Sequence, residues 1–139
     1  MRDRAWLDYR YKQPPSSAYR ILLAERWGEP TGYLIYHLTE NEGLRTGWIV
    51  DLFTAPTDQR SRSALLRHAT SRLYRAGAVT VRLLVARRTA LERWFRGLGF
   101  LPGREAQFAT LLPLREDMPV PALCDPNQFY LMAGDFDVL

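Results

Sequence analysis

The stretch that decides the fold runs from Val79 to Phe100 and reads VTVRLLVARRTALERWFRGLGF. In its first part, apolar and β-branched residues return at every second position, and this period predicts a strand over residues 79–86. Leu84 and Ala86 make the second face of that strand apolar as well. A strand that is apolar on both faces is typical of the interior of a sheet, so we expect it to be buried on both sides.

The second part of the stretch changes period, because apolar residues now return every three or four positions. This spacing predicts an amphipathic helix that begins at Thr89 and ends at Gly99, since glycine readily takes the left-handed conformation that ends helices. Phe100 is then expected to return to the core. The apolar face of the predicted helix consists of Ala90, Leu91, Trp94, Phe95 and Leu98.

Turn residues divide the chain ahead of this stretch into further predicted elements. Three strands in succession, with turns near Gly28 and Gly43, predict an antiparallel meander. After Pro56 comes a polar stretch, and then a helix that ends at Gly77 and has one apolar face, made of Ala64, Leu65, Ala69, Leu73 and Ala76. We place a short helix over residues 2–12 and the three strands over residues 19–27, 31–39 and 47–54.

The order strand, helix, strand over residues 48–86 predicts a crossover in which the third and fourth strands are parallel. The sheet is therefore expected to be mixed but mostly antiparallel, with flanking helices, in the α/β (α+β) class. Two further segments, residues 106–114 and 128–133, can pair as a closing arm on either side of a proline-rich link.

The composition is that of one ordinary globular domain, since 47% of the 139 residues are hydrophobic and 24% are charged. No apolar run approaches the roughly 18 to 20 residues that span a bilayer, and the N-terminus lacks the apolar stretch of a secretory signal. We therefore expect a cytoplasmic protein. Cys124 is the single cysteine and no Cys/His cluster has metal-ligand spacing, so we expect no metal site.

The net charge is +4, carried by eighteen arginines and one lysine. Nucleic-acid binding would suit such a charge, because arginine binds phosphate well. Acidic residues are interspersed almost everywhere and no block of five like charges occurs, which favours an ordinary solvated surface. A modest positive field nonetheless favours an anionic ligand.

Taken in order, the meander, polar stretch, helix, strand, second helix and terminal strands resemble the GNAT superfamily of acyl-CoA-dependent N-acyltransferases. The segment ALERWFRGLGF stands where that family has its fourth-helix signature. The closing segment QFYLMAGDFDVL also resembles the edge of GNAT-like units that occur in tandem in some bacterial proteins. The resemblance implies acetyl-CoA or another acyl-CoA as co-substrate and an amine as acceptor.

The resemblance also implies a shortened domain, because the family's first strand and first two helices would precede the meander. We expect residues 1–139 to form a single domain, as a shortened member or the C-terminal part of a longer protein. Its parts would be an N-terminal arm (1–18), a core (19–114) and a proline-rich link with the terminal strand (115–139). The missing strand leaves one sheet edge open, and we expect a homodimer or a partner domain to cover it.

In the family, the strand that resembles residues 47–54 binds the pantetheine arm through its backbone, which here implies Leu52, Phe53 and Thr54. The start of the following helix binds the pyrophosphate through main-chain N–H groups that glycines leave accessible.

The phosphate loop implied by the resemblance comprises Gln59, Arg60, Arg62, Ser63 and Ala64. Gln59 and Ala64 match the family pattern, but Arg62 replaces its central glycine. The Arg62 side chain could block the phosphates or bind them through its charge. Alternatively, Arg60 and Arg62 are ordinary solvated cations of a loop and have no role in binding phosphate.

Asp51 is the only acid within an apolar strand, at a place where family members often keep a carboxylate that acts as base. Half-burial would disfavour its charged form and suit a base near neutral pH. Pairing with an arginine or capping of the sheet explains Asp51 as well. His37 on the neighbouring strand is an alternative base or a structural residue, and His68 is expected to pack near Leu65.

Two polar side chains that the family often uses are absent, because Phe95 stands in place of a tyrosine acid and Arg88 in place of an asparagine. We keep both positions in the expected CoA-binding surface. The hypotheses are a GNAT-type acyltransferase, a degenerate non-catalytic GNAT-like module for binding or assembly, and a nucleic-acid-binding domain. The acyltransferase hypothesis requires that the strand with Asp51 and the strand with Val81 separate, so that a thioester can enter between them. It also requires that no guanidinium fills the gap.

Overall fold

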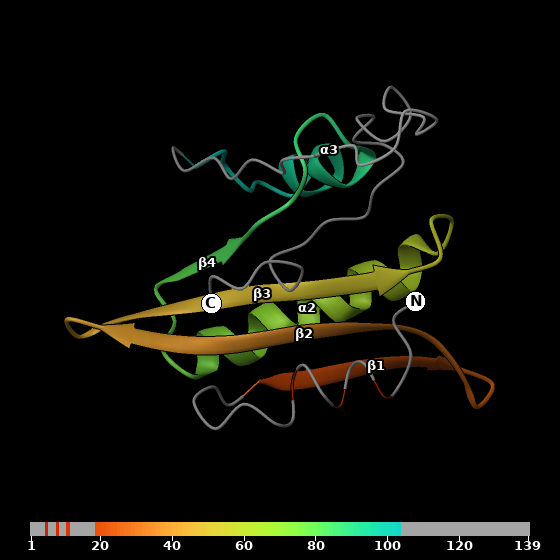
Figure 1. Cartoon of the computed structure of the whole chain (residues 1–139), viewed down its shortest axis with the longest axis horizontal. Coiled ribbons are helices and arrows are strands. Elements are labelled where there is room, and N and C mark those ends of the chain that lie inside the picture. Colours follow the sequence, from red (N-terminus) through yellow and green to blue (C-terminus); the bar gives the residue numbers. More distant parts are fainter. Residues whose placement is uncertain (1–4, 6–7, 9–10, 12–18, 104–139) are drawn as a thin grey trace, which may run out of the picture.

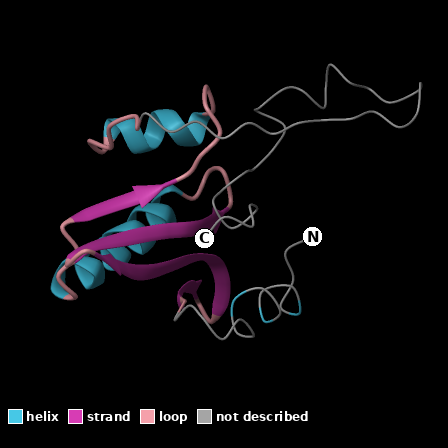
Figure 2. Ribbon diagram, turned by 60° about the vertical axis from the view of Figure 1, so that its left-hand side comes forward, coloured by secondary structure: helices cyan, strands magenta, loops and turns pink. Residues whose placement is uncertain are grey.

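The computed structural model describes residues 5, 8, 11 and 19–103, which form a mixed sheet and two helices (Figure 1). The strand order is β1-β2-β3-β4, in which β4 is parallel to β3 and the other neighbours are antiparallel. The α/β class and the parallel crossover are therefore as predicted, and α2 runs along one face of the sheet (Figure 2). The elements are β1 (Arg20–Arg26), β2 (Glu29–Asn41), β3 (Leu44–Thr54), α2 (Gln59–Arg75), β4 (Thr80–Leu83) and α3 (Ala90–Gly97).

Two tight hairpins build the meander. Trp27 and Gly28 have φ angles of 54° and 84°, and Glu42 and Gly43 have φ angles of 49° and 77°. Two successive residues with positive φ form the two-residue turns that match the twist of antiparallel strands. Because these turns are so short, pairing continues to the ends of β2 and β3, which both extend beyond their predicted bounds.

The start of α2 differs from its prediction. The helix begins at Gln59, so the stretch expected to be a polar loop contains its first turn. The Asp58 carboxylate accepts a hydrogen bond from the Ser61 N–H over 3.0 Å and caps the helix. At the other end, Ala76 is an exposed capping residue rather than part of the buried face, which consists of Ser61, Leu65, Leu66, Ala69 and Leu73.

β4 was predicted wrongly in length and burial. It covers only Thr80–Leu83, and Val79 just before it is 65% exposed. Within the described part of the chain β4 pairs with β3 alone, and its residues are exposed or half-buried rather than buried on both faces. The apolar run continues past the end of β4 to Val85, an isolated β-bridge residue that is half-buried against the core cluster.

The bounds of α3 are close to those predicted, but Ala90 and Leu98 of its predicted apolar face are exposed. Thr89 caps its start by accepting a hydrogen bond from the Glu92 N–H over 3.1 Å, and Gly99 follows its end with a φ of 92°. Phe95 is 2% exposed, and its ring contacts that of Phe100 edge-on at 5.3 Å. Phe100 therefore returns to the core as expected.

Side chains pack on both faces of the sheet. The larger cluster joins the sheet to α2 and α3 around Leu34, Ile49 and Leu52. Neighbouring residues along a strand point to opposite faces, and Tyr33, Ile35 and Val50 form a second cluster on the face away from α2.

Several predictions concern segments that the structure describes little or not at all. Ala5, Asp8 and Tyr11 are helical, within the helix predicted over residues 2–12. The strands predicted at 106–114 and 128–133 and Cys124 lie outside the described residues. Of the helices that are described, none has the length and apolarity needed to cross a membrane. The same part of the chain contains no group of three or more His, Cys, Asp or Glu that could hold a metal ion.

Candidate functional site

β3 and β4 are paired along only part of their length. Their register ends where Ile49 lies opposite Leu83. β3 continues to Thr54, whereas the chain after β4 rises toward α3 (Figure 1). We call this separation of the two backbones, beside residues 50–54 of β3, the β3–β4 parting.

A bulge marks the start of the parting. Ile35 of β2 lies opposite Asp51, but the next residue, Tyr36, lies opposite Ile49, so Val50 has no opposite residue. A bulge bends its strand and increases the local twist. The end of β3 is therefore turned relative to the part of the strand that pairs with β4.

Asp51 lies beside this bulge and is fully buried, with 0% exposure. The Tyr33 hydroxyl donates a hydrogen bond to Asp51 Oδ2 over 3.0 Å. Residues directly opposite in antiparallel strands share a face, so the position opposite Ile35 places Asp51 on the face away from α2. A buried carboxylate beside the parting, held by a tyrosine, is the central group of the candidate site.

His37 lies on the same face of the sheet, opposite Trp48. It is 6% exposed, its ring centroid is 5.1 Å from that of Tyr19, and its Nε2 has no hydrogen-bond partner in the described part of the chain. Burial lowers the pKa of His37 below its ordinary value, because desolvation disfavours the charged ring. The ring is therefore neutral near pH 7. A neutral ring fits both roles considered for His37, the base and the packed structural residue.

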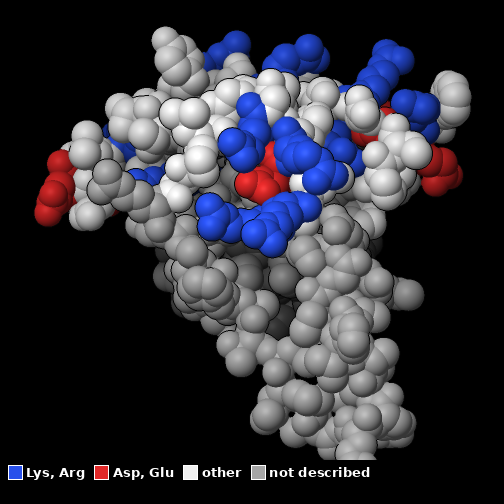
Figure 3. Space-filling model, turned by 90° about the horizontal axis from the view of Figure 1, so that it is seen from above, with Lys and Arg blue, Asp and Glu red and all other residues white. Residues whose placement is uncertain are grey.

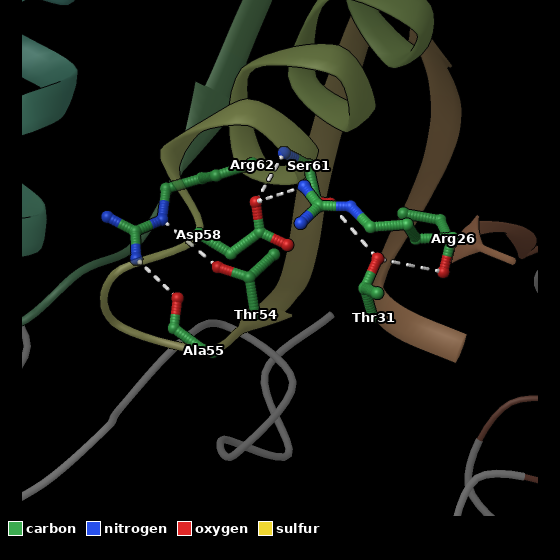
Figure 4. A network of polar contacts seen from close by, with 8 residues as sticks. Arg26, Thr31, Thr54, Ala55, Asp58, Ser61 and Arg62 are labelled. Carbon is green, nitrogen blue, oxygen red and sulfur yellow. Dashed lines mark hydrogen bonds and ion pairs between the residues drawn. The ribbon is translucent and has the colours of Figure 1, made fainter. Parts of the chain in front are cut away.

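The Arg62 guanidinium lies at the end of β3 (Figure 4). Its Nε donates to Thr54 Oγ1 over 3.2 Å, and its Nη2 donates to the carbonyl oxygens of Ala55 and Pro56 over 3.3 and 3.1 Å. Its Cζ lies 5.5 Å from the centroid of the Trp94 ring on α3. Arg62 is thus a held, partly buried cation at the end of the parting, and not the freely solvated loop residue considered from the sequence.

The first turn of α2 already carries an anion of its own. Asp58 Oδ1 accepts the Ser61 N–H and lies 3.7 Å from Arg26 Nη2 (Figure 4). The hydrogen bond from Ser61, with the charges of Arg26 and Arg60, holds the pKa of Asp58 below its ordinary value. N–H groups at a helix start are those that would bind phosphate, so one of them is engaged by the chain itself.

The remaining residues predicted on β3 and α2 differ in accessibility. Leu52 is 1% exposed in the core against α2, whereas Phe53 is 47% exposed and stacks on Tyr33 with centroids 5.8 Å apart. The residues at the start of α2 that face solvent are Gln59, Arg60 and Ser63, with Ala64 half-buried.

On α3, Phe95 lies in the core between Trp94 and Phe100, and Arg88 is exposed with a left-handed φ of 64°. Looking down onto α3, basic side chains gather around an acidic one (Figure 3). The Glu92 carboxylate accepts the Arg88 N–H over 2.5 Å and lies 4.0 Å from Arg96 Nη1. The exposed arginines of this segment are Arg87, Arg88, Arg93 and Arg96.

The structure adds two residues to the candidate site: Tyr33, on the second predicted strand, and Trp94, which was predicted only on the apolar face of its helix. Tyr33 holds Asp51, and Trp94 contacts Arg62. The alternation of side chains along β2 puts Tyr33 on the same face as Ile35, which lies opposite Asp51. The sequence could therefore have indicated that Tyr33 lies near Asp51, once the strand pairing is known. Trp94 gives no such local signal, because its partner lies on a different helix.

Comparison with known proteins identifies the fold. No family model matches the sequence, and no curated protein is significantly similar to it. Among solved structures, a candidate acetyltransferase of Agrobacterium tumefaciens str. C58 superposes with a TM-score of 0.63 at 18% identity, over 80% of this chain and 81% of that chain. A candidate acetyl transferase of Pyrococcus furiosus superposes with a TM-score of 0.62 at 18% identity, over 69% and 68% of the two chains. A ribosomal-protein-alanine N-acetyltransferase of Brucella melitensis gives a TM-score of 0.55 at 15% identity, over 68% and 72%.

Proposed function

We propose that this chain, which has the GNAT acyltransferase fold, binds an acyl-CoA beside the β3–β4 parting and supports transfer of the acyl group to an amine. One observation carries the proposal: pairing between β3 and β4 ends at Ile49, and the buried carboxylate of Asp51 lies just beyond that point. The main chain of residues 52–54, which lies beyond the last residue pair between β3 and β4, would bind the pantetheine arm.

Asp51 is the group that accepts the proton of the attacking amine. Its Oδ2 is oriented by the Tyr33 hydroxyl at 3.0 Å, so the carboxylate does not need to reorganise during proton transfer. The bound acyl-CoA would supply the activated thioester and its thiolate leaving group. His37 is a second candidate base on the same face, and its neutral state fits that role.

Arg62 takes the place of the phosphate-binding backbone in this proposal. Its present acceptors at the end of β3 are neutral oxygens at 3.1 to 3.3 Å, in a partly exposed position. These hydrogen bonds have an ionised donor but neutral acceptors, whereas a phosphate would add the Coulomb attraction of an opposite charge and could accept two parallel bonds from the guanidinium. A phosphate would therefore compete well for the guanidinium. Arg26, Arg60 and Arg62 also outnumber the one carboxylate of Asp58 there.

Calorimetric titration of the full chain with acetyl-CoA tests binding, with Arg62→Ala and the exposed Arg67→Ala as a matched pair on α2. Loss of a charge-assisted contact should weaken binding by about tenfold or more in Arg62→Ala and leave Arg67→Ala unchanged. No heat and no thermal shift at millimolar acetyl-CoA would end the proposal. Release of free thiol with a panel of amines then tests transfer, which Asp51→Asn should slow by about 10²–10⁴ without changing acetyl-CoA affinity.

A second candidate, a non-catalytic GNAT-like module for binding or assembly, is favoured by a specific observation. The guanidinium of Arg62 bridges β3 and α3, and Asp58 uses the Ser61 N–H, so the chain itself engages the phosphate end. In this alternative Arg62 excludes CoA. Arg62→Gly would then gain affinity for acetyl-CoA relative to the unaltered chain, which is the reverse of the effect expected for a phosphate ligand.

A further inference from the structure

A groove with a volume of about 790 Å³ runs between β1 and α2. Its apolar floor includes Leu22, Ala24 and Leu65, which belong to the core cluster or pack against it. Its rim is basic. None of these floor residues has a role in the proposed acyl transfer, so the groove requires its own explanation.

The β1 side of the groove is a strand edge. In the described part of the chain β1 pairs with β2 alone and stands at the outer end of the sheet (Figure 1). Leu23 is 56% exposed and Trp27, at the end of the strand, is 94% exposed. An edge strand presents unpaired N–H and C=O groups, which can pair with one more strand.

The α2 side of the groove is a row of side chains spaced four residues apart. Arg60, Ala64, His68 and Arg72 all line the groove, and such spacing places side chains above one another on one helix face. His68 is exposed in this row and not packed as the sequence analysis expected. The row is about 18 Å long and the five β1 residues that line the groove, Leu22–Arg26, span about 16 Å, so the two sides are similar in length.

We propose that this groove binds an extended, acidic segment of a partner protein as an added strand on β1. The main chain of that segment pairs with the β1 edge. Its apolar side chains lie on the floor at Leu22 and Leu65, and its carboxylates reach Arg60 and Arg72 on the helix above. The inference goes beyond acyl transfer and does not depend on it.

Charge complementarity selects an acidic partner over a second copy of this chain. Two copies paired symmetrically through β1 would bring together two α2 rows, each with Arg60 and Arg72, and each copy would add only one lining acid, Glu25. Like charges facing each other at an interface are unfavourable. A nucleic acid would satisfy the arginines but would leave the aliphatic floor and the strand edge unused.

The test uses the full chain labelled with ¹⁵N and a blocked peptide of about eight alternating Glu and Val residues, the length that matches β1. Binding should shift the amide signals of β1 and of the α2 row, and the matching Lys–Val peptide should not bind. Arg72→Glu should weaken the Glu–Val peptide by about tenfold or more. Arg75→Glu is the control, because Arg75 is also a basic residue in the last turn of α2 but does not line the groove.

Three results would overturn the proposal. The first is that both peptides bind equally well or that neither binds. The second is that the amide signals shifted by the Glu–Val peptide lie outside β1 and α2. The third is a dimer in light scattering whose β1 amides are already protected from hydrogen exchange, since a second copy would then cover the edge.

Discussion

The guanidinium of Arg62 lies over the indole ring of Trp94, with its Cζ 5.5 Å from the ring centroid. One side chain thereby joins the first turn of α2 to α3 and, through Thr54, to the end of β3. The position that a phosphate-binding loop would leave open is spanned by a cation. Whether that cation receives or excludes an anionic ligand is the functional question on which the two candidate functions differ.

The contact between Arg62 and Trp94 should be measurable as a coupling energy. A double-mutant cycle with Arg62→Ala and Trp94→Leu should give about 0.5–1 kcal/mol, the range of cation–π pairs at partly exposed sites. Urea denaturation of the four proteins provides the values. The same cycle with Arg67→Ala, whose side chain is exposed elsewhere on α2, should give a coupling near zero; equal couplings would show that the contact contributes nothing specific.

Two glycine-to-alanine substitutions should have opposite effects on stability. A Cβ at Gly47 would lie 2.6 Å from Leu73 Cδ1, and Leu73 is 1% exposed in the core. Gly47→Ala should therefore destabilise the protein by about 1–3 kcal/mol through overpacking. A Cβ at Gly97, the last residue of α3, meets nothing within 4 Å, so Gly97→Ala should stabilise by up to about 1 kcal/mol. Thermal and urea unfolding distinguish the two, and a neutral Gly47→Ala would contradict the packing of β3 on α2.

Stability should fall as the pH drops, because of His37. Burial lowers its pKa in the folded protein, so below about pH 6.5 the unfolded chain binds a proton that the folded chain does not. The contribution of His37 to the free energy of unfolding is fully present above that pH, and it is lost as the pH falls toward the pKa of His37 in the folded protein. Melting temperatures between about pH 7.5 and pH 5 should show this slope.

The His37→Gln variant should flatten that slope, whatever its absolute stability. His68→Gln, which removes an exposed histidine, serves as the control and should keep it. If the slope survives in His37→Gln, another group is responsible for the pH dependence.

The hydrogen bond between Tyr33 and Asp51 should matter for both stability and the proposed transfer. Tyr33→Phe removes the donor and leaves the buried Asp51 Oδ2 with one hydrogen bond fewer, which should cost about 1–3 kcal/mol. If the hydroxyl also positions the carboxylate for proton transfer, the same variant should change the pH profile of turnover. A variant that loses stability but keeps the profile would make Tyr33 a structural residue only.

Local sequence patterns were sufficient for most elements of the fold. The period of two, the change of period after Ala86 and the stop at Gly99 located β4 and α3, because each signal resides in a few neighbouring residues. Capping chemistry refines such boundaries: Asp58 starts α2 earlier than its apolar face suggested. Periodicity did not reveal that β4 has no fully buried face, since burial depends on what packs against a strand and not on the strand's own residues.

For the candidate site as well, the sequence predicted some features and only the structure showed others. The sequence by itself determined that Asp51 is the only acid in an apolar strand and that Arg62 stands where the family pattern has a glycine. Both statements depend only on the identity and the order of the residues. Only the tertiary structure decided that Tyr33 holds Asp51, that β3 parts from β4 beyond Ile49, and that Arg62 reaches Trp94. Those contacts join residues distant along the chain, and packing and hydrogen-bond geometry become defined only when the sheet and the helices come together.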